Sequence, residues 1–128
     1  MPAWTQDQLN KIGRAEELQI ESRRSDGTLR KPVTIWVVRD GDDLFIRPVN
    51  GRESSWFRGT QARHEGRIRA GSVGADVTFE DADPASSEPI DAAYREKYRR
   101  YAANIVNSVL TPKARAATLR LVPRAPGG

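Results

Sequence analysis

The chain is divided into short runs of strand-forming residues by turns that contain glycine, aspartate or both. These runs alternate between apolar and polar residues or are rich in β-branched and aromatic residues, and both patterns are typical of strands. Six strands are predicted, at residues 17–21, 30–39, 44–49, 66–70, 75–82 and 118–122. Six short strands in one small chain predict a curled sheet or a small barrel whose open ends are covered by helices.

The run from residue 30 to residue 39 carries the strongest strand signal. Its centre, Val33–Val38, is continuous, β-branched and aromatic, so we expect both of its faces to be covered. The turn Asp40–Asp43 then leads into residues 44–49, which predicts a hairpin. Seven side chains of the predicted strands are expected in the core: Val33, Ile35, Val37, Leu44, Ile46, Val77 and Phe79.

Helices are predicted at three places. Thr5 and Gln8 form a capping-box pattern that begins a short N-terminal helix, and Gly13 ends it. Residues 54–62 predict a short helical turn capped by Ser54 or Ser55. From residue 90 to about residue 110 the apolar period becomes helical, which predicts one longer C-terminal helix. Its apolar stripe consists of Ile90, Tyr94, Tyr98, Tyr101 and Ile105.

Composition excludes several kinds of chemistry. The 128 residues include no cysteine and a single histidine, His64, so thiolate chemistry and cysteine zinc sites are excluded and no metal site is expected. The sequence has no Walker or Rossmann glycine pattern and no nucleophile elbow, which argues against a hydrolase. No apolar run or secretory signal indicates a membrane or export. We therefore expect a cytoplasmic protein with one domain over residues 1–124 and a loose tail over residues 125–128.

Positive charge is concentrated in one part of the chain. Residues 23–69 contain eleven arginines and lysines against six acidic residues, whereas residues 76–98 contain two against seven. Arginine forms paired hydrogen bonds with carboxylates and phosphates. The basic turn at residues 22–32 and the segment at residues 51–59, which joins hydroxyls to Trp56 at a helix start, are therefore candidates for an anion site. An exposed hairpin loop and a capped helical turn with core aromatics explain the same residues equally well.

In order and spacing, these segments resemble the FMN-binding split β-barrel group. Within this group they are most similar to the branch of deazaflavin-dependent nitroreductases, whose fold is similar to that of pyridoxamine-phosphate oxidase. They also resemble a family of short bacterial proteins of unknown function. The resemblance rests on Arg23–Gly27, Arg30–Pro32, Asp40–Ile46 and Ser54–Trp56, and it covers residues 18–80. It implies an α+β fold, a small six-stranded antiparallel split β-barrel with a short N-terminal helix and one longer C-terminal helix.

The resemblance also implies a function. It implies that the chain binds FMN or the deazaflavin coenzyme and acts as an oxidoreductase, with no residue assigned to catalysis. The residues that match the group's cofactor site are Arg30, Lys31, Arg52, Ser54, Ser55 and Trp56. The basic and hydroxyl groups of this set would hold the phosphate, and Trp56 would lie against the ring or the ribityl chain. A homodimer is implied as well, with Trp36 and the helix from Ile90 at the seam.

Two other functions remain open. A fold does not fix a function, so the same barrel can serve as a non-enzymatic binding module, either a cofactor carrier or a partner-binding domain. Nucleic-acid binding ranks third: the isoelectric point near 9.8 favours it. Proteins that bind single strands expose aromatic side chains, however, and Trp36, Phe45 and Phe79 lie in apolar strands and are expected inside.

Overall fold

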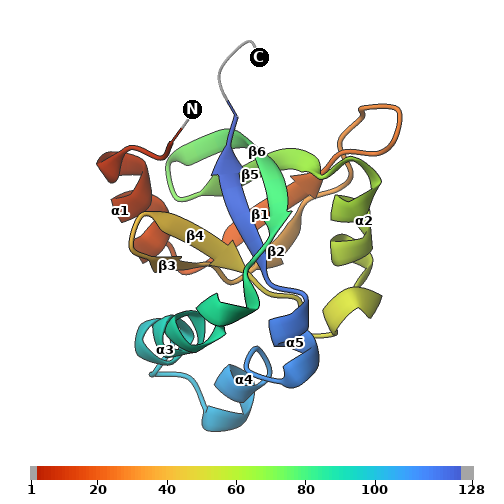
Figure 1. The fold of residues 1–128 in the computed structure, drawn as a ribbon. Coiled ribbons are helices and arrows are strands. Elements are labelled where there is room, and N and C mark those ends of the chain that lie inside the picture. Colours follow the sequence, from red (N-terminus) through yellow and green to blue (C-terminus); the bar gives the residue numbers. More distant parts are fainter. Residues whose placement is uncertain (1–2, 125–128) are drawn as a thin grey trace.

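The computed structural model describes residues 3–124, which form one antiparallel sheet of seven strands and five α-helices. The strands are β1 Leu18–Ser22, β2 Val33–Ile35, β3 Val38–Asp40, β4 Asp43–Ile46, β5 Glu65–Ala70, β6 Val73–Asp81 and β7 Leu119–Pro123. Their order across the sheet is β2-β1-β5-β6-β7-β4-β3 (Figure 1). The predicted tail at residues 125–128 lies outside the described residues.

The helices are α1 Gln6–Arg14, α2 Ser55–Arg63, α3 Ser87–Lys97, α4 Ala103–Asn107 and α5 Pro112–Ala116. Figure 1 shows α3, α4 and α5 gathered at one end of the sheet, with α1 and α2 on either side. The predicted capping box is confirmed, because the Thr5 side chain accepts from the Gln8 N–H and the Gln8 side chain accepts from the Thr5 N–H. Among residues 3–124, no helix has the length and apolarity needed to cross a membrane.

The prediction of one strand over residues 30–39 is wrong. The segment forms two strands, β2 and β3, which lie at opposite edges of the sheet and are joined through Trp36 and Val37. The sheet therefore has seven strands rather than six, and this short link brings its two edges together at one point. The physical reason is distant in sequence: the Tyr98 hydroxyl and the Lys97 ammonium bind the backbone of Val37, where a continuous strand would have ladder partners.

The prediction of one longer C-terminal helix is also wrong. The helix α3 ends at Lys97, and Tyr98 leaves the helical region at φ −108° and ψ 23°. Two shorter helices, α4 and α5, follow. The break shifts the helical period, so Ile105 of the predicted stripe is exposed and its neighbour Val106 is buried instead. Ser54 does precede α2, as predicted, but its side chain makes no capping hydrogen bond within the described part.

Buried apolar side chains form two clusters. The larger lies between the sheet and helices α1 and α2, and the smaller packs β3 and β4 against α3 and α4. Five of the seven predicted core residues are buried: Val37, Leu44, Ile46, Val77 and Phe79. Ile35 is half-buried, whereas Val33 is 38% exposed, so the expectation for Val33 is wrong. Both belong to β2, an edge strand that borders a cavity.

Candidate functional site

A cavity of about 680 Å³ opens between β2, the start of α2 and helix α4. Exposed apolar side chains mark it: Val33, Val49 and Ile105, the large apolar residues exposed within residues 3–124, all belong to its lining. Trp36 and Trp56 add two indole rings. The polar lining residues are Thr34, Arg47, Asn50, Glu53, Ser54, Ser55 and Ser108. A concave apolar surface with a few polar groups is the usual form of a small-molecule site.

A smaller cavity of about 290 Å³ adjoins the first. The two share the lining residues Val33, Ser55 and Trp56, and we treat them as two chambers of one cleft. The smaller chamber contains three cationic side chains: Arg24, Arg30 and Lys31. The cleft therefore has an apolar, aromatic chamber at one end and a cationic chamber at the other.

Arg30 is held against helix α2 in a way that leaves its donors available. A methyl group in place of the Gly59 hydrogen would lie 3.0 Å from both Cδ and Nε of Arg30, so the glycine permits this close packing. The Nε of Arg30 is buried and has no hydrogen-bond partner within residues 3–124. The Nε of Arg30 thus lies against α2, while the Arg30 side chain contributes its positive charge to the lining of the chamber.

The start of α2 adds further donors. The first N–H groups of a helix have no acceptor within the helix. The Ser54 hydroxyl does not satisfy them in the described structure, and Ser54 and Ser55 both line the larger chamber. The positive end of the helix dipole therefore lies beside the cationic chamber and would favour a bound anion there.

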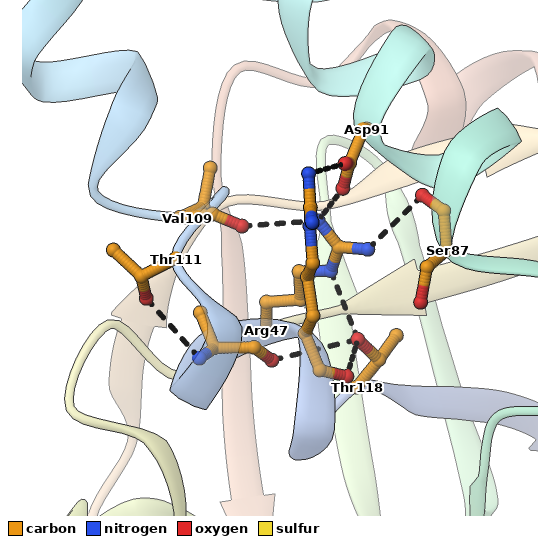
Figure 2. A network of polar contacts seen from close by, with 8 residues as sticks. Arg47, Ser87, Asp91, Val109, Thr111 and Thr118 are labelled. Carbon is orange, nitrogen blue, oxygen red and sulfur yellow. Dashed lines mark hydrogen bonds and ion pairs between the residues drawn. The ribbon is translucent and has the colours of Figure 1, made fainter. Parts of the chain in front are cut away.

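Figure 2 shows a buried ionic network, of which Arg47 and Val109 line the larger chamber. Arg47 donates from Nη1 to Asp91 at 2.5 Å and to the Val109 carbonyl at 3.0 Å, and from Nε to the Thr118 hydroxyl at 2.9 Å. Arg115 forms a second ion pair with Asp91 through the other carboxylate oxygen, Oδ2. Because the Arg47 donors are occupied and its charge is neutralised, we assign Arg47 to joining β4, α3 and the end of α4 rather than to holding a ligand.

A family model described as "Uncharacterized protein conserved in bacteria (DUF2255)" matches residues 8–121. The chain belongs to this bacterial family. A search of curated proteins found no match to the sequence.

Solved structures with the same fold include flavin-binding and related proteins. An F420 reductase matches with a TM-score of 0.59 at 15% identity, over 91% of this chain and 93% of that chain. A FAD-binding protein from Mesorhizobium loti matches with a TM-score of 0.57 at 12% identity, over 97% and 93%. HutZ, a heme storage protein from Vibrio cholerae, matches with a TM-score of 0.65 at 10% identity, over 94% and 90%. At these identities the likeness shows the fold, which is the split barrel that the sequence resembles.

The structure brings together five of the six residues that were predicted from the sequence to bind the cofactor. Arg30, Lys31, Ser55 and Trp56 line the cationic chamber, and Ser54 lines the larger chamber. Arg52 lies outside both linings. Its side chain is exposed, donates to the Ala116 carbonyl at 3.4 Å and stacks over the Phe57 ring.

Several lining residues were not predicted from the sequence. Arg24 lies in the basic turn at residues 22–32, so its charge and position could have placed it in the predicted anion site. Trp36, Val49 and Ile105 had no such signal, because only the curl of the sheet and the helix break bring them to one cavity. Within residues 3–124, no cluster of three or more histidine or acidic side chains is arranged to hold a metal ion.

Proposed function

We propose that the chain binds a phosphorylated flavin-type cofactor, FMN or the deazaflavin coenzyme, in the two-chambered cleft and acts as an oxidoreductase. The observation that carries the proposal is the junction of an aromatic chamber of about 680 Å³ with a chamber that contains Arg24, Arg30 and Lys31. Such cofactors have a flat ring at one end and a phosphate along a flexible chain. The two ends of the cleft match these two ends of the ligand in chemistry and in order.

In this arrangement the phosphate lies in the cationic chamber. Arg30 donates from a guanidinium whose Nε has no protein partner within residues 3–124, and Lys31 adds a second, exposed charge. The amide groups at the start of α2 and the Ser55 hydroxyl complete the set of donors, because a phosphate accepts several hydrogen bonds at once. Trp56 lines both chambers, so it lies beside the chain that joins phosphate to ring.

The free edge of β2 suits the ring of the cofactor. The Ser22 carbonyl accepts from the Arg30 N–H at 2.9 Å, so Ser22 and, by alternation, Ile20 direct their backbone groups toward β2. Ile20 pairs with Val33, which leaves the next residue, Thr34, with its N–H and C=O on the unpaired side that borders the larger chamber. Flavin and deazaflavin rings carry a pyrimidine edge of donors and acceptors that such groups complement.

When bound, the cofactor would supply the two-electron redox chemistry, and the chain would bind and orient it. Val33, Val49 and Ile105 would cover the ring and exclude water from it. Arg47, which lines the larger chamber, would be held in place by Asp91.

Haem fits the cleft less well than a flavin. Haem iron is held by an axial histidine, cysteine, methionine or tyrosine. Neither chamber contains any of these residue types, and His64 lies exposed at the C-terminal end of α2. Nucleic-acid binding is less well supported, because Phe45 and Phe79 are buried, as expected, and cannot stack on bases. Trp36, which was also expected inside, is instead half-buried and lines the larger chamber. A non-enzymatic cofactor carrier would use the same cleft. It would differ from an oxidoreductase only in how fast the bound cofactor exchanges electrons with a second substrate.

A thermal-shift series tests the proposal. FMN, the deazaflavin coenzyme, haem and a single-stranded oligonucleotide are each added over a wide concentration range, since a ligand of the native state raises the melting temperature by mass action. We expect stabilisation by a phosphorylated flavin. Stabilisation by haem or by the oligonucleotide alone would reject the proposal. Faster oxidation of the bound, reduced cofactor by a quinone or nitro compound than of free cofactor distinguishes an oxidoreductase from a carrier.

A further inference from the structure

Two indole rings line the larger chamber, and they lie at different distances along the cleft. Trp56 belongs to both chambers, whereas Trp36 belongs to the larger one alone. A ligand anchored by its phosphate between Arg30 and Lys31 therefore passes Trp56 first and reaches Trp36 with its far end. We infer that Trp36 is the platform on which the flat ring of the ligand stacks, and that Tyr98 is the residue that positions this platform. The inference rests on the proposed cofactor binding and deepens it.

One face of the Trp36 ring is covered by Tyr98, and the Trp36 side chain lines the larger chamber. On the covered side it stacks on Tyr98, with ring centroids 3.8 Å apart and an interplanar angle of 5°. Tyr101 packs against the same pair at 5.1 Å from Trp36, tilted by 53°. Trp36 is half-buried and lines the larger chamber, so its remaining face is the one a planar ligand meets. Offset stacking on such a face is the preferred contact between flat π-systems.

Trp36 occupies the link between β2 and β3, and this link is fixed by side chains of α3 and its end. The Tyr98 hydroxyl accepts from the Val37 N–H at 3.2 Å and donates to the Glu16 carbonyl at 2.9 Å. The Lys97 ammonium donates to the Val37 carbonyl at 2.6 Å. Both backbone groups of Val37 thus have partners although the strand is broken there. The Trp36 ring is held in place before any ligand arrives, which reduces the entropy lost on binding.

This arrangement explains why the strand breaks where it does. Val33–Val38 has the composition of one continuous strand, yet its ladder is interrupted at Trp36 and Val37. The lost ladder bonds are replaced by Tyr98 and Lys97, and Trp36 packs against the smaller core cluster while it also lines the larger chamber. Trp56 packs against the larger core cluster and meets Phe57 edge to face.

The test uses the full chain with FMN as the probe and three substitutions: Trp36→Leu, Trp36→Phe and Trp56→Leu. An indole in face contact with a flavin quenches its fluorescence, so we expect bound FMN to be quenched in the parent protein. Trp36→Leu should weaken FMN binding by about 2- to 10-fold and should restore the fluorescence of bound FMN. Trp36→Phe should recover part of the affinity. Trp56→Leu should weaken binding while the quenching persists.

Tyr98→Phe tests the positioning role, because it keeps the stacked ring and removes the hydroxyl. At saturating FMN we expect less quenching than in the parent protein, which a loss of stability alone would not produce. Quenching that is lost in Trp56→Leu and kept in Trp36→Leu would overturn the inference and leave the proposed cofactor binding intact. Unchanged quenching in Tyr98→Phe would overturn the role of Tyr98. Failure of the parent protein to bind any flavin would overturn the inference together with the proposed function.

Discussion

Replacing Asp91 by asparagine should reduce the free energy of unfolding by about 3–5 kcal/mol. The side chains of Arg47 and Asp91 are 0% and 1% exposed, and their closest atoms are 2.5 Å apart. The asparagine side chain would have nearly the same shape but no charge, so the Arg47 guanidinium would stay buried without a counter-charge. Since small domains are stable by only about 5–15 kcal/mol, this loss would be a large part of the total.

Urea unfolding followed by tryptophan fluorescence measures this loss. For slopes of about 1–3 kcal/mol per molar urea, the midpoint should fall by more than about 1 M. The matched control is Asp43→Asn, which removes the same charge from a half-exposed ion pair with Arg120 and should cost no more than about 1 kcal/mol. Replacing both buried partners, Arg47→Met with Asp91→Leu, should recover much of the stability. Equal losses in Asp91→Asn and Asp43→Asn would refute the reasoning.

Three further predictions concern charge and assembly. Arg30→Ala should lower FMN affinity about 10-fold or more in calorimetry, whereas Arg69→Ala, at an exposed arginine outside both chambers, should leave it unchanged; equal effects would mean that only overall charge matters. Burial lowers the pKa of Lys97 to about 8, so the unfolded state binds more protons above that pH. The free energy of unfolding should therefore rise from pH 8 towards pH 10, and Lys97→Met should remove this part of the slope in denaturant titrations. Light scattering should give the mass of a homodimer; a monomer mass at all concentrations would contradict the expected seam at Trp36 and the helix from Ile90.

The parts of the fold that could be predicted from sequence depend on neighbours in the chain. The capping box of Thr5 and Gln8, the hairpin of β3 and β4 and the strands β5 and β6 are set by residues within a few positions of one another. Their local signals agree with the final structure: β5 and β6 lie within two residues of their predicted bounds, whereas β4 ends three residues before its predicted end at residue 49.

The features that could not be predicted depend on contacts between distant residues. The strand break at Val37 requires Tyr98, which is 61 positions away, and the helix break at Tyr98 accompanies the same contacts. Val33 has the composition of a core residue, but its strand lies at the sheet edge beside a cavity. Likewise, Arg52 lies only two positions from Ser54 in sequence, yet the 3₁₀ turn Gly51–Glu53 leaves its guanidinium at the Ala116 carbonyl.

A comparison of FMN with riboflavin tests the central claim most directly, because the two ligands differ only in the phosphate. FMN and riboflavin are each titrated into the parent protein and into Arg30→Ala by isothermal titration calorimetry, which gives four affinities. The same titrations are made with a second pair of ligands, the deazaflavin coenzyme and its phosphate-free core. We expect the phosphorylated ligand to bind at least about 10-fold more tightly to the parent protein, and this advantage to disappear in Arg30→Ala. Equal affinities for the two members of each pair, or no binding by any of the four ligands, would contradict the assignment of the cleft.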